Sequence, residues 1–200
     1  MKKIREFILK AGLIISLSWG LYFFWTRIYR FLRQRKYKGP VAVRHSLEEL
    51  RAEIRKHEWK KDTWRELGDA ISYPRHFEEV GHLSKLGNDC DDFSIWCLDA
   101  AREGFEDTGL KWMPLGLMSV VWKEGKKLSG HNVAVFVAYD GDVVRLAHMS
   151  NWRNGHMYWI NESVYGGIAL DVARAMGKPL AGWRLTSPDL RKKVACKIYL

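Results

Sequence analysis

The spacing of apolar residues changes from helical to extended near residue 115, and this change limits the folds open to the chain. Apolar residues recur every three or four positions after a Ser46–Glu49 capping box, and again after Cys90. From Leu115 onward, runs rich in Val, Ala and Phe are separated by turn sequences such as Asp140-Gly141. Helices followed by hairpin-connected strands predict an α+β domain with an antiparallel sheet.

Capping and turn signals divide the chain after the Gly39-Pro40 break into discrete elements. The patterns predict helices over Ser46–Trp59, over a stretch holding Trp64, Leu67 and Ile71 that ends before Pro74, from Asp89 or Cys90 to Gly104, and over Leu170–Met176. They predict strands over Leu115–Trp122, Asn132–Tyr139, Val143–Met149 and Val194–Tyr199, a helix or loop over Phe77–Leu86, and a short element holding Trp159, Ile160 and Val164.

The first forty residues differ in character from the rest. Ala11–Thr26 carries no charge and is rich in Leu, Ile, Phe and Trp, and with Phe7–Leu9 it approaches the length of a membrane span. Residues 1–40 also hold ten of the 33 Lys and Arg but one of the 23 acidic residues. We therefore expect residues 1–40 to form a single-pass membrane anchor with a basic flank, and residues 41–200 to form the folded domain.

Two alternatives for this segment remain open: a cleaved signal peptide, and a helix that lies on the membrane surface. The basic flank after the apolar run weakly favours a cytoplasmic domain, in agreement with an odd number of cysteines. Residues 41–200 are nearly neutral, which argues against nucleic-acid binding. The chain has no Cys-x-x-Cys, no His-Glu-x-x-His and no phosphate-binding glycine loop, so we expect neither metal nor cofactor.

Cys90 is the candidate nucleophile. It stands where a helix is predicted to begin, and unpaired backbone N–H groups at a helix N-terminus favour a thiolate. Asp91 and Asp92 oppose the thiolate, so activation has to come from a base. The polar neighbours of Cys90 argue against burial as an inert core cysteine, the position that Cys97 is expected to take.

His131 is the candidate base, because it precedes a predicted strand and lies on the side of Val133 and Val135. The return strand offers a residue to orient the imidazole. A three-residue turn places Asn151 opposite His131, whereas an Asp140-Gly141 turn places Ser150 opposite it, with His148 diagonal. Asn151 is preferred, because an amide oxygen can hold one imidazole nitrogen, and His148 and Ser150 remain alternatives.

Gly87-Asn88-Asp89-Cys90-Asp91-Asp92-Phe93, followed by Gly130-His131-Asn132-Val133 and a polar residue on the next strand, resembles the transglutaminase-like (papain-like) cysteine peptidases of bacteria and phages. The resemblance spans roughly residues 70–152. It implies a papain-like α+β fold, with Cys90 as nucleophile and His131 as general base. The chain departs from the family pattern by one extra residue between Gly87 and Asp89. It also lacks the third-strand Asp, for which Asn151 is the nearest substitute.

These residues predict acyl transfer at an amide bond of a protein or peptide substrate through a thioester. The Cys90 N–H is a natural oxyanion donor, and Trp64, Tyr73 and His76 are possible side-chain donors. A different class of function is also open: a membrane-tethered binding or structural module that has the fold but no turnover. The absence of the third-strand Asp is compatible with such a module. A reactive Cys90 thiol would distinguish an enzyme from a binding or structural module.

Overall fold

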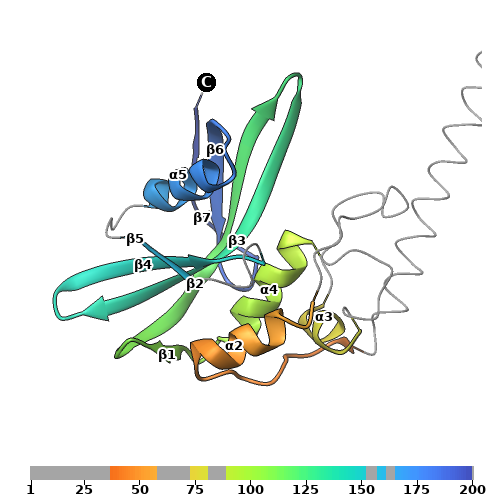
Figure 1. The fold of residues 1–200 in the computed structure, drawn as a ribbon, viewed down its shortest axis with the longest axis vertical. Coiled ribbons are helices and arrows are strands. Elements are labelled where there is room, and N and C mark those ends of the chain that lie inside the picture. Colours follow the sequence, from red (N-terminus) through yellow and green to blue (C-terminus); the bar gives the residue numbers. More distant parts are fainter. Residues whose placement is uncertain (1–36, 58–72, 81–88, 152–156, 161–164, 200) are drawn as a thin grey trace, which may run out of the picture.

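The computed structural model describes residues 37–57, 73–80, 89–151, 157–160 and 165–199. Figure 1 shows its elements, which are α2 (Leu47–Ile54), α3 (Pro74–Val80), α4 (Cys90–Ala100), β1 (Phe105–Asp107), β2 (Leu110–Glu124), β3 (Lys127–Asp140), β4 (Val143–Met149), β5 (Met157–Ile160), α5 (Tyr165–Ala175), β6 (Leu180–Thr186) and β7 (Lys193–Ile198). The fold is α+β, with helices packed against an antiparallel sheet.

The predicted membrane anchor and the helix predicted around Trp64 lie outside the described residues. Within the ranges that the structure describes, no helix has both the length and the apolar character to cross a membrane.

The described strands form one seven-stranded sheet in the order β5-β4-β3-β2-β6-β7, and β1 pairs with the start of β2. Figure 1 shows the long β2–β3 hairpin running from the end of the molecule that holds α2 and β1 toward the end that holds β6 and β7. Its turn is formed by Gly125 and Lys126, and Gly125 has a φ of 63°. This hairpin therefore connects the two ends of the molecule.

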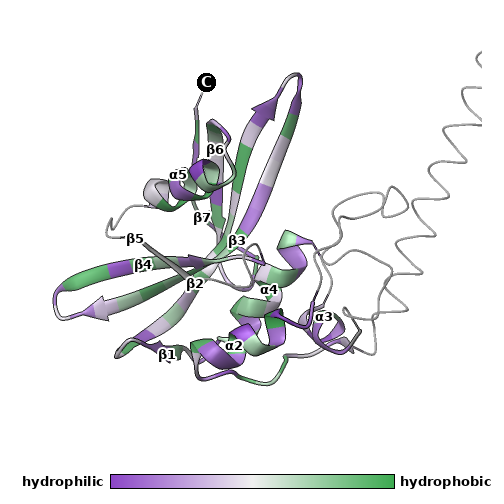
Figure 2. Cartoon of the chain, viewed as in Figure 1, coloured by the Kyte–Doolittle hydropathy of each residue, from purple (hydrophilic) through white to green (hydrophobic). Residues whose placement is uncertain are grey.

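Both faces of the sheet are covered by helices. One core joins α2, α3 and α4 to side chains such as Ala134 and Phe136 of β3. The other joins α5 to the alternate residues Val133 and Val135. In Figure 2 hydrophobic and hydrophilic positions alternate along the hairpins where they leave these cores. Because β3 lies between the two cores, four consecutive residues from Val133 to Phe136 have no exposed surface.

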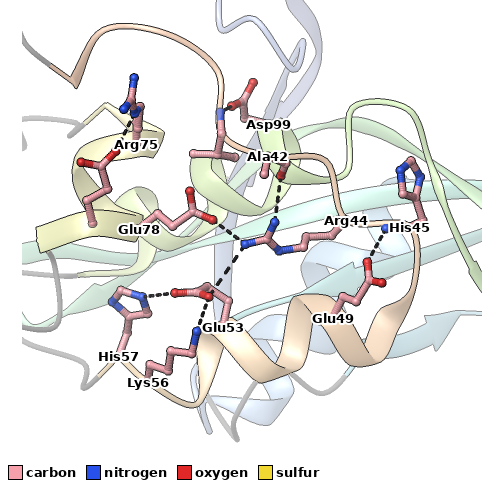
Figure 3. A network of polar contacts seen from close by, with 12 residues as sticks. Ala42, Arg44, His45, Glu49, Glu53, Lys56, His57, Arg75, Glu78 and Asp99 are labelled. Carbon is pink, nitrogen blue, oxygen red and sulfur yellow. Dashed lines mark hydrogen bonds and ion pairs between the residues drawn. The ribbon is translucent and has the colours of Figure 1, made fainter.

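A buried polar cluster joins α2 to α3, and Figure 3 shows Arg44 reaching both Glu78 and Glu53. The Arg44 guanidinium lies 2.7 Å from Glu78 and 3.9 Å from Glu53. Burial alone would raise the pKa of Glu53, but hydrogen bonds and charge from Lys56 and His57 outweigh it and lower that pKa. Burial raises the pKa of Glu78 despite the charge of Arg44. The cluster therefore fixes the two helices that precede α4.

Several sequence predictions can be compared with these bounds. The strand Val143–Met149 is confirmed residue for residue. The helix after Asp89 is confirmed, although it ends at Ala100 rather than at Gly104. The first helix is confirmed with its Ser46 cap, but it ends at Ile54, earlier than predicted. The strands β1 and β6 were missed, because β1 has only three residues and β6 lacks a simple alternation of apolar and polar residues.

Candidate functional site

Cys90 is the first residue of α4, as the sequence predicts. The Asp89 side chain caps the helix by accepting a hydrogen bond from the Asp91 N–H at 3.2 Å. Cys90 is partly exposed, whereas Cys97 on the apolar face is fully buried, and burial raises the pKa of the Cys97 thiol far above its ordinary value. The helix N-terminus favours a thiolate at Cys90, and the buried Asp91 and Asp92 carboxyl groups oppose it.

Ser94 attaches the thiol end of α4 to the sheet. Its buried hydroxyl lies 2.6 Å from the Cys90 carbonyl oxygen and 3.1 Å from that of Asn132, and it serves as donor to both. Asn132 directly follows His131 on β3. One hydroxyl therefore joins the residue that carries the thiol to the neighbour of the imidazole.

His131 is held by the residues that follow β4. Its Nε2 lies 2.6 Å from the Ser150 hydroxyl oxygen, and that hydroxyl donates to Asn151 Oδ1 over a longer distance of 3.4 Å. If the Ser150 proton points to Asn151, Nε2 has to carry the imidazole proton that Ser150 accepts. The Nδ1 atom is then the basic nitrogen. This is the tautomer that a base needs when its other nitrogen is held in place.

The surroundings of His131 keep the imidazole neutral. Burial, and secondarily the positive charge that His148 can carry, lower the pKa of His131 to about 4. The Asp89 carboxylate partly opposes this change. At pH 7 His131 is thus able to accept a proton, and it is not a standing cation that would stabilise a thiolate.

The three candidates for the orienting residue have different contacts. Ser150 contacts His131 directly, and Asn151 contacts Ser150. His148, which is 3% exposed, lies 2.9 Å from an Asp171 carboxylate oxygen on α5. Its hydrogen bond lowers the pKa of Asp171. Of the three candidates, Ser150 is therefore the one whose hydroxyl contacts the imidazole, and Asn151 accepts a hydrogen bond from that hydroxyl. His148 instead connects β4 to α5.

Both strand registers expected for the β3–β4 hairpin are wrong. Asp140 pairs with Val143, so the two turn residues are Gly141 and Asp142. Gly141 has a φ of 60°, and a glycine with positive φ at the first turn position is typical of a type II′ turn. The ladder ends at the Ala134–Met149 pair, and His131 lies beyond it. Ser150 reaches His131 through a side-chain contact from outside the strand.

Cys90 and His131 line one open cleft of about 380 Å³. Its other walls come from the middle of β2, including Ser119 and Val121, and from the start of β3, including Gly130. Of the possible oxyanion donors, Trp64 lies outside the described residues. Neither Tyr73 nor His76 lines the cleft, and His76 packs instead against the Tyr37 ring. The Cys90 N–H is the donor that the structure places beside the thiol.

The sequence could not reveal whether His131 lies on the same face of the sheet as the helix that carries Cys90. By alternation His131 shares its side of β3 with Val133 and Val135, as predicted, but these two pack beneath α5. The helix that begins with Cys90 packs on the opposite side, against Ala134 and Phe136. His131 and the helix that carries the thiol therefore lie on opposite sides of β3, and both reach the cleft at the stretch of β3 that precedes its ladder with β4.

Among the described residues, the ligand atoms of Asp89, Cys90 and Asp91 lie within 4.8 Å of one another. Asp89 already accepts the helix-capping hydrogen bond, and acidic groups are common in the first turn of a helix. We assign no metal to this group.

Comparison of the chain with family models, with curated proteins and with solved structures found no match in any of the three.

Proposed function

We propose that the chain is a membrane-anchored cysteine hydrolase or acyltransferase that acts on amide bonds of a protein or peptide substrate. Its catalytic residues would be Cys90 and His131, with Ser150 and Asn151 as positioning residues. The observation that carries the proposal is the cleft that Cys90, at the start of α4, shares with His131. The resemblance of the Cys90 and His131 motifs to the transglutaminase-like cysteine peptidases supports the same chemistry.

The reaction would begin with transfer of the Cys90 thiol proton to His131 Nδ1. The sulfur then forms a bond to the carbonyl carbon of the amide, and the oxyanion accepts a hydrogen bond from the Cys90 N–H. The C–N bond breaks as the imidazolium returns its proton to the departing amine, which leaves a thioester on Cys90. Water attacks the thioester carbonyl carbon and gives a proton to His131. The C–S bond then breaks, and the imidazolium returns that proton to the Cys90 sulfur as the carboxylic acid forms. A second amine in place of water would give a new amide.

The proposed base requires a neutral imidazole with a fixed tautomer. The pKa of His131, near 4, provides the first condition because it leaves the imidazole neutral at pH 7, but it also makes the imidazole a weak base for a thiol. The hydrogen bond from Nε2 to Ser150 provides the second, and Asn151 supports Ser150. The Ser94 hydroxyl holds the start of α4 against β3 and so limits movement of the thiol relative to the imidazole.

A second function is favoured by a specific observation, the side of β3 on which His131 lies. Since α4 packs on the other side, the imidazole and the thiol belong to different faces of the sheet. A fold of this kind without a working pair would be a membrane-tethered binding or structural module. Membrane attachment itself rests on the sequence of residues 1–40, which also weakly favours a cytoplasmic domain.

Site-resolved alkylation separates the two functions, because the chain carries its own control thiols. Cys196 is exposed and Cys97 is buried, so they report an ordinary accessible thiol and an inaccessible one. The full-length protein is treated with iodoacetamide between pH 5 and 9, and each cysteine is quantified by mass spectrometry.

The enzyme proposal predicts that Cys90 reacts at pH 7 at least tenfold faster than Cys196, and that His131→Gln removes this advantage. Ser150→Ala should reduce it, since the imidazole loses its fixed tautomer. If Cys90 reacts like Cys196 and ignores His131, the thiol is not activated and the binding module is the better description.

A further inference from the structure

The face of the sheet that holds the cleft continues beyond α4 onto β6 and β7. Ser119, which lines the cleft, pairs with Asn132 on one side and with Arg184 on the other. Arg184 in turn pairs with Cys196 of β7. Directly paired residues of antiparallel strands project to the same face, so these four form one row across the sheet.

This row lies on the cleft side and not beneath α5. The neighbours of Ser119 and Arg184 along their strands, Met118 and Leu185, are buried in the core that contains α5. Alternation therefore places Ser119 and Arg184 on the opposite face, the one against which α4 packs. The Arg184 side chain thus stands on the same face as the thiol of Cys90.

The next row of the same face contains two glycines. Gly130 pairs with Val121, and Val121 pairs with Gly182. A Cβ at Gly130 would lie 2.7 Å from the Val120 carbonyl oxygen, and one at Gly182 would lie 3.0 Å from the Lys197 carbonyl oxygen. A side chain at Gly130 would therefore displace the backbone, and one at Gly182 would fit only if β7 moved slightly. A strip whose largest side chain is Val121 therefore leads from the cleft past Arg184, and it ends at the exposed Ile198 of β7, which pairs with Gly182.

Arg184 is exposed, and its side chain makes no hydrogen bond or ion pair with any residue that the structure describes. Other arginines of the described ranges have carboxylate partners: Arg44 has Glu78, and Arg145 has Asp140. A guanidinium binds a carboxylate through two parallel hydrogen bonds, which makes it the natural cationic group for an anionic ligand.

We propose that Arg184 binds a carboxylate of the substrate, and that the substrate is an acidic peptide lying along the strip beyond the cleft. The proposal rests on the proposed function and names the substrate class of the same site. Arg184 is two strands from Asn132, which corresponds to about 10 Å. An extended peptide covers that distance in about three residues at about 3.3 Å each.

The charge of Asp89 supports the same placement. Asp89 lines the cleft beside Cys90, so a second carboxylate close to the thiol would be repelled. A substrate whose acidic side chain lies two or three residues from the scissile amide avoids Asp89 and reaches Arg184. The two charges together select the position of the acidic residue relative to the bond that reacts.

Protection of Cys90 from alkylation tests this proposal whether or not the thiol is activated, because at pH 9 an ordinary accessible thiol also reacts with iodoacetamide. The full-length protein is incubated with acetyl-Ala-Ala-Glu-Ala-amide or with its Gln analogue. Labelling of each cysteine is then followed by mass spectrometry. The variants are Arg184→Gln, Arg184→Lys and, as a matched exposed control, Arg191→Gln.

The Glu peptide should protect Cys90 at about tenfold lower concentration than the Gln peptide, as expected for loss of a charge-assisted hydrogen bond. Arg184→Gln should abolish this difference, Arg184→Lys should retain part of it, and Arg191→Gln should leave it unchanged. Equal protection by the two peptides, absence of protection, or a difference that survives Arg184→Gln overturns the proposal.

Two further measurements in the same experiment distinguish failure of this proposal from failure of the proposed function. Shielding of Cys196 without shielding of Cys90 would place the peptide on β7 outside the cleft, and would also overturn the proposal. The rate at which iodoacetamide alkylates Cys90 at pH 7 without peptide, compared with the rate at Cys196, reports activation of the thiol alone. An unactivated Cys90 with Arg184-dependent protection would reject the enzyme and retain a site for acidic peptides.

Discussion

Protonation of His131 should destabilise the folded protein between pH 6.5 and 4. The imidazole has a pKa near 4 in the folded state and about 6.5 when unfolded. Between these values the unfolded chain binds the proton and the folded chain does not, so stability is complete above pH 6.5 and falls as the pH decreases. A difference of about 2.5 pKa units corresponds to about 3 kcal/mol at pH 4.

The assay is urea unfolding of the full-length protein, followed by tryptophan fluorescence at pH 7, 6, 5 and 4, for the wild type and for His131→Gln. Both proteins contain the other titrating groups, such as Glu53, Glu78 and Asp171, so the difference between the two curves isolates His131. The wild type should lose about 3 kcal/mol more than the variant between pH 7 and pH 4. Parallel curves would refute the inference that the folded protein holds His131 in its neutral state.

Three other perturbations test the structure. Ser94→Ala should cost about 1 kcal/mol in urea unfolding, because the partly buried carbonyl groups of Cys90 and Asn132 lose the hydroxyl donor that they share, and an unchanged midpoint would contradict this. Asp171→Asn should lower stability at pH 7 by about 1 kcal/mol through loss of the His148 contact. Because the folded pKa of Asp171 is lowered, that cost should vanish on acidification below about pH 4, and a pH-independent cost would argue against the pair. Gly116→Ala should cost about 3 kcal/mol or more in thermal unfolding, since its Cβ would lie 2.1 Å from the Thr186 carbonyl oxygen; a stable variant would show that β2 and β6 are not so close.

The sequence predicted those parts of the fold that local patterns determine. The strand Val143–Met149 has a turn on one side and loop sequence on the other, and its bounds were correct. The start of α4 was correct because Asp89 is a strong capping residue. The turn of the β3–β4 hairpin was misplaced by one residue. This small error changed the predicted β4 partner of every residue of β3.

The candidate site was predicted as far as it depends on residue type. Cys90 and His131 line one cleft, and Ser150 was among the alternatives named for the third position. Alternation placed His131 correctly beside Val133, but no local pattern states which face of a sheet a distant helix will cover. Arg184 was missed because its relation to the cleft depends on the β2–β6 pairing, between strands that are more than fifty residues apart.

The burial of β3 on both faces has a consequence for the synthesis of the chain. The segment Val133–Val137 is uncharged, apolar and rich in β-branched residues, which is the composition of aggregation-prone segments. The helix that covers one face, α4, precedes this strand, whereas α5 follows it. During translation α4 can shield its face at once, but the face of Val133 and Val135 stays open until α5 has left the ribosome. For that interval the nascent protein depends on fast elongation or on a chaperone.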